Sequence, residues 1–218
     1  PLTLCNFCDA ELPTNPSDSL IARGRVLFDI SVPYPLPENP LHRRLSHQQT
    51  ADYCTQHRFE QQHIPRALAE GWPFKPNFAT LFHRILYLGR PLRNLCQVLD
   101  QSFFFTAARE YYSDKVAQRS SLGARYSSNR SSQHGAGYYG ERGYQLLVQA
   151  IRFMFPDSPD LLAKFQPLTY EIIILEILLP EAAMRLIEQD LNIPPKDAID
   201  VLRASYNFGV GLHPANDD

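Results

Sequence analysis

Prolines set the strongest limit on how this chain of 218 residues can fold, because 18 of them are spread along it. A proline in the interior of a helix breaks it, and the residue before a proline is pushed toward extended geometry. Four prolines fall between Pro33 and Pro40, so we expect an ordered extended connector there. Other prolines stand at the starts of amphipathic segments, where a helix accepts them. The chain is therefore expected to form short helices separated by connectors.

The segments between the prolines have the periodicity of helices. Residues 78–89 place Phe78, Leu81 and Ile85 at helical spacing before a glycine. Similar amphipathic patterns occur at 15–28, 46–63, 102–117, 144–155, 180–192 and 194–209. The β-branched run 172–174 would also suit a buried strand, but its flanks are helical, and no alternating run with hairpin turn signals occurs. The sequence therefore predicts an all-α fold.

Length and composition suit one globular domain or two closely packed lobes, and we predict one compact multi-helix domain over residues 1–218. A chain of this size, 44% hydrophobic, can bury a core without disulfides. We divide it into an N-terminal part (1–72), helices (73–116), a loop rich in Ser, Gly, Arg and Tyr (117–143), and acidic C-terminal helices (144–218). Residues 1–144 carry 16 Lys and Arg against 12 acidic residues, and the remainder carries 5 against 11. This polarity fits either ordinary surface variation or a functional division.

Cysteine use and hydropathy bear on the compartment. Four cysteines are too few for a disulfide scaffold, and no signal peptide is recognised, so we expect a reducing compartment such as the cytosol or nucleus. The longest apolar stretch, Ile172–Pro180, is too short to span a membrane. A soluble protein without a membrane partner is expected, and its oligomeric state stays open.

Two similarly spaced pairs of metal-binding residue types stand near the N-terminus: "CNFC", with Cys5 and Cys8, and "CTQH", with Cys54 and His57. A Cys-x-x-Cys turn sets two thiolates within reach of one ion, and residues three apart on a helix share a face. Three cysteines and one histidine form a closed tetrahedral zinc site. The sequence therefore predicts an N-terminal zinc knuckle with a structural zinc ion.

The alternative is a coincidence of three buried thiols and an exposed histidine, because the spacer of 45 residues is longer than in compact zinc fingers. Long spacers are tolerated, since loop-closure entropy grows only logarithmically. His47 is the second choice as fourth ligand, while His63 lies off the helical face of Cys54. Cys96 stands among apolar neighbours and is interpreted as a core thiol.

The loop 117–143 is the best candidate for binding a partner. It interleaves arginines with tyrosines, which suits phosphate contact and base stacking, and its glycines would let a ligand approach the backbone. Its candidate residues are Arg119, Arg125, Arg130, Tyr138, Tyr139 and Arg142. A second, weaker basic patch is formed by Arg43 and Arg44. The alternative is a solvated loop whose tyrosines pack back onto the helices, and its serines would also suit phosphorylation.

Catalytic motifs are missing from the sequence. It has no His-Glu-x-x-His, no phosphate-binding glycine loop followed by lysine, no Gly-x-Ser-x-Gly and no dinucleotide fingerprint. The zinc deaminase pattern also fails, because Arg58 and Phe59 follow His57. We therefore expect no enzymatic activity.

The order of several motifs resembles the fungal restriction-of-telomere-capping domain, number four of its series. They run as "CNFCDAELP", "NPLHRR", "CTQHRFE", "EGWP", "GYYGERG", "LPEAAMRLIEQDLNI" and "AIDVLRASYNFG" over nearly the whole chain. The resemblance implies a domain often placed at the C-terminus of longer fungal proteins, residence in nucleus and cytoplasm, and a link to telomere capping. It also implies that Cys5, Cys8, Cys54 and His57 are the family's Cys/His set.

Together these features predict a non-enzymatic module with a structural zinc that binds nucleic acid or a chromatin-associated partner through the basic loop. The alternative is a protein-interaction or oligomerisation module that uses the C-terminal helices. Salt dependence separates the two, because phosphate contacts weaken steeply with salt.

Overall fold

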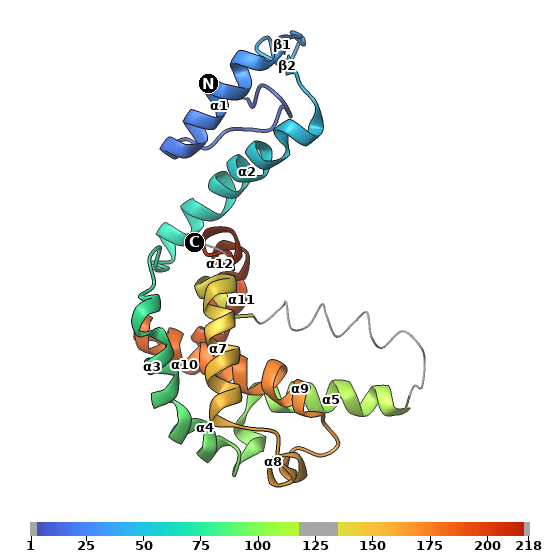
Figure 1. Cartoon of the computed structure of the whole chain (residues 1–218), viewed down its shortest axis with the longest axis vertical. Coiled ribbons are helices and arrows are strands. Elements are labelled where there is room, and N and C mark those ends of the chain that lie inside the picture. The colour runs from blue at the N-terminus through green and yellow to red at the C-terminus, as the bar shows by residue number, and fades with distance from the viewer. Residues whose placement is uncertain (1–3, 118–134, 216–218) are drawn as a thin grey trace. The chain divides into compact units, whose positions relative to one another are not determined.

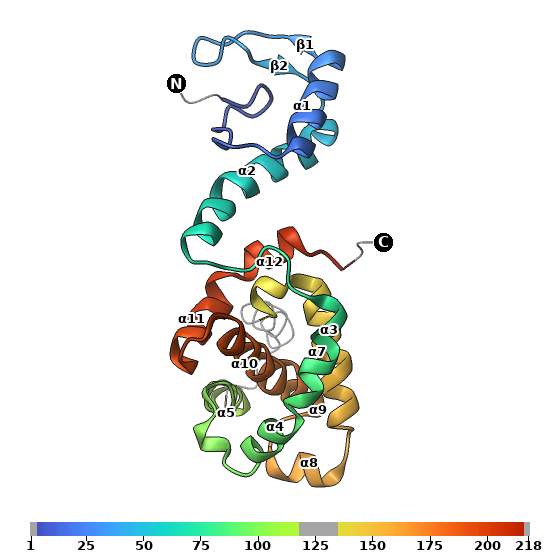
Figure 2. The same cartoon turned by 90° about the vertical axis from the view of Figure 1, so that its left-hand side faces the viewer.

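The computed structural model of the chain describes residues 4–117 and 135–215, and helices dominate both stretches (Figures 1 and 2). The predicted all-α fold is confirmed. The chain divides into two compact units, Pro1–Gly71 and Trp72–Asp218, which are described separately as the N-terminal and C-terminal units. That the two units unfold together, as one domain would, stays a prediction. No helix in the described ranges is long and apolar enough to cross a membrane.

The N-terminal unit holds two helices and a minimal antiparallel ladder. In chain order its elements are α1 (Asp18–Ile30), β1 (Val32–Pro33), β2 (Arg43–Arg44) and α2 (His47–Ala69). The ladder pairs Val32 with Arg44 and Pro33 with Arg43, so the proline-rich connector folds back on itself between the helices. The connector is thus ordered and extended, as the prolines predict.

Helices α1 and α2 pack together around a small core. Leu20 and Leu27 of α1 are buried, and they meet Tyr53 and Cys54 of α2 and Cys5 of the N-terminal loop. Ser17 caps α1 by accepting from the Leu20 amide, and its hydroxyl donates to the buried carboxylate of Glu60 on α2 (2.5 Å). This link fixes the start of α1 on α2.

Helix α2 continues past the point where the sequence predicts its end. The prediction stops it near Pro65, but the helix runs through that proline to Ala69. Pro65 is exposed, so the carbonyl group that loses its amide partner can be solvated by water. Proline makes such an extension costly but does not forbid it.

The C-terminal unit is a bundle of short helices. Its elements are α3 (Phe78–Tyr87), α4 (Gly89–Leu95), η1 (Leu99–Gln101), α5 (Phe103–Ala117), η2 (Gly137–Tyr139), α7 (Gly140–Met154), α8 (Pro159–Lys164), α9 (Tyr170–Ile172), η3 (Ile173–Leu178), α10 (Leu179–Leu191), α11 (Pro195–Ala204) and α12 (Tyr206–Leu212). The run 172–174 is helical, as its flanks predict.

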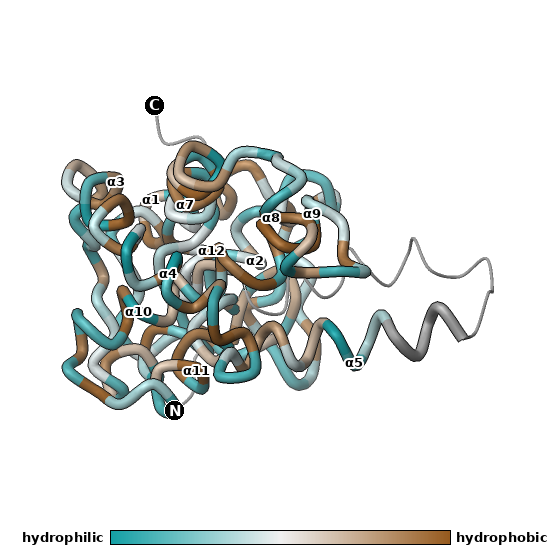
Figure 3. The backbone as a smooth tube through the Cα atoms, turned by 90° about the horizontal axis from the view of Figure 1, so that it is seen from below, coloured by the Kyte–Doolittle hydropathy of each residue, from teal (hydrophilic) through white to brown (hydrophobic). Residues whose placement is uncertain are grey.

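Helix α10 forms the centre of this unit and packs against α3, α7, η3 and α11 (Figure 2). Its residues 179–184 are all buried, as are Leu186 and Ile187. The preceding segment η3 is a π-helix, a wider turn that ends just before Pro180. In a regular α-helix the ring of Pro180 would clash with the carbonyl group of Glu176, and the wider turn relieves this clash. Hydrophobic and hydrophilic residues are intermixed along the helices (Figure 3), as expected for amphipathic helices.

The predicted loop 117–143 is only partly described, and its described end is not a loop. Residues 137–139 form η2, and α7 begins at Gly140. Gly137 and Gly140 have positive φ angles, and the backbone of η2 lies directly against Gly209 of α12. Only glycines allow two backbones to approach so closely. The prediction of a loop is therefore wrong over 137–143, because this segment is helical and packs into the bundle.

Candidate metal centre

The "CNFC" segment forms a tight turn whose amide groups point at its own sulfur atoms. The chain pairs Leu4 with Glu11, the Cys5 amide donates to the Ala10 carbonyl (2.8 Å), and Asp9 takes a left-handed φ of 58°. The Phe7 amide donates to Cys5 Sγ (3.5 Å), and the Ala10 amide donates to Cys8. Amide donors stabilise thiolates, so the turn is shaped for two anionic sulfur ligands.

The other two candidate ligands come from one face of α2. Cys54 and His57 are one helical turn apart, and both are buried against α1 and the N-terminal turn. The His57 ring packs on Tyr53, with 5.6 Å between ring centroids. The helix therefore holds its two side chains in fixed directions toward the turn.

The four side chains converge on one point. Their candidate ligand atoms all lie within 4.8 Å of one another, and His57 Nε2 lies 3.3 Å from Cys8 Sγ. Tetrahedral zinc with bonds of about 2.3 Å to sulfur and about 2.0 Å to nitrogen would place its ligand atoms about 3.5–3.8 Å apart. The predicted residues are thus assembled into a donor set that fits a metal ion such as zinc.

Electrostatics of the cluster also fit a cation. Burial raises the pKa values of the Cys5 and Cys54 thiols, and the neighbouring thiols raise them further. Burial alone would also raise the pKa of Cys8, but hydrogen bonds from the Ala10 amide and the Arg58 side chain lower it overall. Burial lowers the pKa of His57, which favours the neutral imidazole that a metal requires. A divalent cation would stabilise all three thiolates together.

The proline-rich connector secures the knuckle from outside. Buried Asn39 donates to the Cys5 carbonyl (2.9 Å) and to the Asp9 carboxylate (2.8 Å). The Arg43 amide donates to the Asn6 carbonyl (2.7 Å). The Asn39 amide, with His42 beside it, holds the pKa of the Asp9 carboxyl below its usual range. Sequence reasoning missed Asn39, although an asparagine before a proline in a connector could have signalled such an anchoring turn.

The rival residues lie outside the cluster. His47 is exposed at the start of α2, and His63 is half-buried beside the Phe59 ring. Cys96 is buried in the C-terminal unit, where burial raises the pKa of its thiol. Its description as a core thiol therefore fits the structure.

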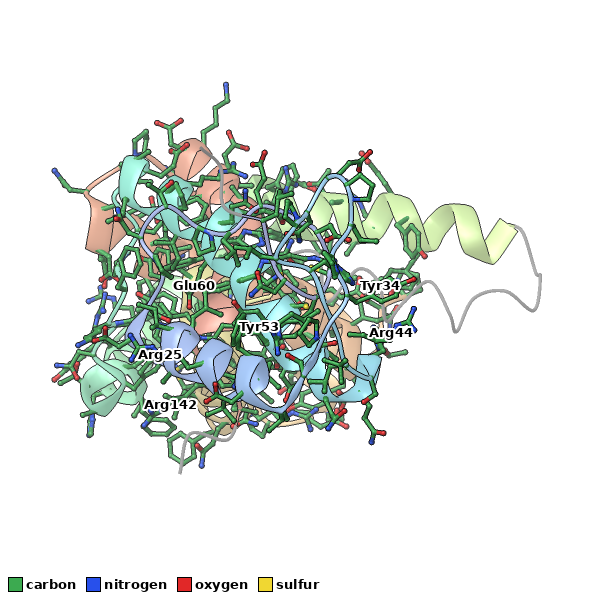
Figure 4. The ribbon with its side chains drawn as sticks, turned by 90° about the horizontal axis from the view of Figure 1, so that it is seen from above. Arg25, Tyr34, Arg44, Tyr53, Glu60 and Arg142 are labelled. Carbon is green, nitrogen blue, oxygen red and sulfur yellow. The ribbon has the colours of Figure 1, made fainter. Side chains whose placement is uncertain are left out.

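Arg43 and Arg44 each lie over an aromatic ring. The guanidinium carbon of Arg43 is 3.9 Å from the Phe28 centroid, and that of Arg44 is 4.0 Å from the Tyr34 centroid. Figure 4 labels Arg44 and Tyr34. Arg43 also donates to the hydroxyl and carbonyl groups of Ser31, so its side chain is fixed by the fold. Arg44 is exposed. Only Arg44 of this pair has its side chain largely open to a partner.

The tyrosines of the predicted binding loop are buried. Tyr138 and Tyr139 are 0% exposed, and both hydroxyl groups donate to Asp190 at the end of α10. Arg84 of α3 donates to the same carboxylate (2.7 Å). Burial raises the pKa values of both tyrosines. The prediction that these rings stack on a ligand is wrong, because they bind together α3, η2 and α10, as the alternative interpretation of the loop expected.

Of the four candidate arginines in this segment, Arg142 lies among the described residues. Arg119, Arg125 and Arg130 lie outside the described residues. Arg142 is exposed on α7, with its guanidinium carbon 4.8 Å from the Phe78 centroid. It lines a cavity of about 360 Å³ with Gln145 and Gln149. Of the three predicted residues that the structure describes, Arg142 is exposed while Tyr138 and Tyr139 are buried, so these three do not form one surface.

The fold and the cluster define an all-α protein with a candidate metal centre in its N-terminal unit. Comparison with known families adds that residues 99–214 match the RTC4-like domain, more than half of the chain. The chain belongs to this family, as its motifs predict. Searches of curated proteins and of solved structures found no match. The family match begins at Leu99, so it does not extend to the metal cluster, and the assignment of these ligands to the family stays a prediction.

Proposed function

We propose that the chain is a non-enzymatic binding module whose N-terminal unit is held together by one structural zinc ion. The observation that carries this proposal is the convergence of Cys5, Cys8, Cys54 and His57 within 4.8 Å. Three thiolates and one imidazole fill all four positions of tetrahedral zinc. Such a site has no open position for a substrate or an activated water molecule, so its contribution is to stability.

Metal content tests the proposal. Protein purified without chelator should contain one zinc per chain, and the Cys54→Ser variant should lose it. The matched control is Cys96→Ser, which removes a buried thiol outside the cluster and should keep the metal. Cobalt substituted for zinc should give the visible bands of a tetrahedral site and thiolate-to-metal charge transfer. A folded parent without metal, or equal metal loss in both variants, would contradict the proposal.

The partner we favour is a chromatin-associated protein, with residence in nucleus and cytoplasm and a role linked to telomere capping through the family. Support comes from the surface of α1, where Ile21 is 39% and Phe28 is 41% exposed. Large exposed apolar side chains in a small unit are typical of protein-interaction surfaces. The alternative contact face, the C-terminal helices, is less favoured, because the apolar side chains of α10 are buried within the bundle and cannot contact a partner.

Nucleic acid is the second candidate, and the two arginine–aromatic stacks at β1 and β2 favour it. Guanidinium groups beside exposed rings suit phosphates and bases. In this case binding of labelled single-stranded DNA or RNA should weaken steeply with salt, and Arg44→Ala should weaken it further. Replacing Arg125, Arg130 and Arg142 by alanine tests the contribution of the arginines of segment 117–143. If binding does not depend on salt concentration and is unchanged in these variants, nucleic acid is excluded as the partner.

A further inference from the structure

A groove of about 500 Å³ lies between the metal knuckle, α1 and α2 in the N-terminal unit. Its volume falls within the range of ligand sites in proteins, roughly 300–1,000 Å³. Most of its lining is aromatic, aliphatic or proline. The side chains that define it best are those of Phe7, Pro13, Ile21, Phe28 and Tyr53. The groove therefore offers a largely apolar surface that an apolar side chain of a partner could cover.

Two residues next to the proposed metal ligands form walls of this groove. Phe7 lies between Cys5 and Cys8, and Tyr53 directly precedes Cys54. The Phe7 and Tyr53 rings meet edge to face, with 5.8 Å between centroids. Metal binding would thus order both rings, and the inference about this groove rests on the proposed zinc site.

Charges at the rim indicate what kind of occupant fits. Arg25 and Asp29 of α1 both line the groove and both are exposed (Figure 4 labels Arg25). Neither makes an ion pair within the described parts of the chain. A basic residue four positions before an acidic one is the less favourable order for pairing within a helix. Both charges are therefore available to a partner.

The presence of both signs favours a polypeptide over a nucleic acid. Asp29 would repel phosphate groups, and residues 1–71 carry 6 Lys and Arg against 8 Asp and Glu. We propose that the groove docks a linear segment of a partner protein in which a large apolar side chain enters the groove between an acidic residue, paired with Arg25, and a basic residue, paired with Asp29. Charge complementarity then sets the direction of the segment.

The test uses the full chain and a library of random peptides displayed on phage. Selected peptides should share a large apolar residue flanked by opposite charges. Ile21→Lys, inside the groove, should weaken their binding about tenfold or more, whereas Val26→Lys, on an exposed part of α1 outside the groove, should not. Arg25→Glu should weaken binding as well, and replacing the acidic residue of the peptide by lysine should restore it.

Zinc content and helicity of each variant are measured first, so that loss of the metal site is distinguished from loss of the groove. If the parent holds zinc but no peptide consensus emerges, or Ile21→Lys and Val26→Lys act alike, the docking proposal is overturned while the zinc proposal stands. If the parent forms a dimer and Ile21→Lys converts it to a monomer, the occupant of the groove is a second copy of the chain. If the parent binds single-stranded DNA and Ile21→Lys abolishes that binding, the occupant of the groove is a nucleic acid. Either result overturns the proposal that the groove docks a peptide segment.

Discussion

Replacing Gly209 by alanine should destabilise the C-terminal unit, although helix propensity alone predicts the opposite. Gly209 lies within α12, where alanine is favoured over glycine by about 1 kcal/mol. A Cβ atom at this position would lie 2.0 Å from the Gly137 carbonyl oxygen and 2.8 Å from the Gly140 nitrogen. Both are backbone atoms, so no side chain can rotate away to make room.

The size of the effect follows from this contact. Restoring an ordinary separation of at least 3.4 Å requires α12 to move by about 1.4 Å from η2. Phe208, which is fully buried, packs on Trp72 and Phe74 and would move with it. Overpacking of this kind typically costs about 1–3 kcal/mol, and a clash between two backbones belongs at the upper end. After the gain in propensity, a net loss of about 2 kcal/mol is expected.

Urea unfolding followed by the fluorescence of Trp72, the single tryptophan of the chain, measures this loss. The midpoint should fall by about 1 M, given the usual dependence of about 1–3 kcal/mol per molar urea. Gly211→Ala is the matched control, because Gly211 lies in the same helix but is exposed, and it should unfold at the parent midpoint or above. A Gly209→Ala variant as stable as the parent would refute the packing of α12 on η2.

Three further substitutions test other contacts. Asn39→Ala should weaken metal retention against a chelator and lower the free energy of unfolding of the N-terminal unit by about 1–3 kcal/mol, because it removes two hydrogen bonds that hold the knuckle. Metal retention equal to that of the parent would contradict this prediction. Burial raises the pKa of Glu181, despite a hydrogen bond from Ser102. The parent should therefore lose stability as pH rises above about 4.5 through that raised pKa, and Glu181→Gln should lose less stability over the same range. Identical stability profiles against pH for parent and variant would exclude the effect. Tyr139→Phe leaves Asp190 without one donor and should lower the free energy of unfolding by about 1 kcal/mol. Tyr87→Phe, at an exposed position, should leave the free energy of unfolding unchanged.

The cluster of Cys5, Cys8, Cys54 and His57 could be predicted from the sequence because each pair is local. A Cys-x-x-Cys turn and a helical Cys-x-x-His fix the geometry of two side chains within four residues, so only the meeting of the two pairs had to be inferred. The rest of the centre could not be predicted, because Asn39 reaches the Cys5 carbonyl across 34 positions of the chain. The asparagine before Pro40 can signal a turn, but no periodicity or motif shows which distant group that turn will hold.

The "GYYG" segment shows why the binding loop was misplaced. Glycines beside tyrosines allow close approach to the backbone, and the sequence reasoning assigned that approach to a ligand. In the structure the approaching group is the backbone of Gly209, about 70 positions further along the chain. The same residues suit both situations, since a glycine that admits a ligand also admits a helix. Only the partner of the contact, which is distant in sequence, decides between them.

The metal cluster and the family match occupy different units, which makes their coupling measurable. The cluster lies within residues 5–57, with a core of its own around Leu20 and Leu27, while the match begins at Leu99. Separate cores lead us to expect that removing the metal by chelation or by Cys54→Ser abolishes the helicity of α1 and α2 and leaves the urea midpoint of Trp72 unchanged. If the Trp72 transition moves with the metal, the two units unfold as the single domain that the sequence predicts, and the zinc ion then stabilises the whole chain.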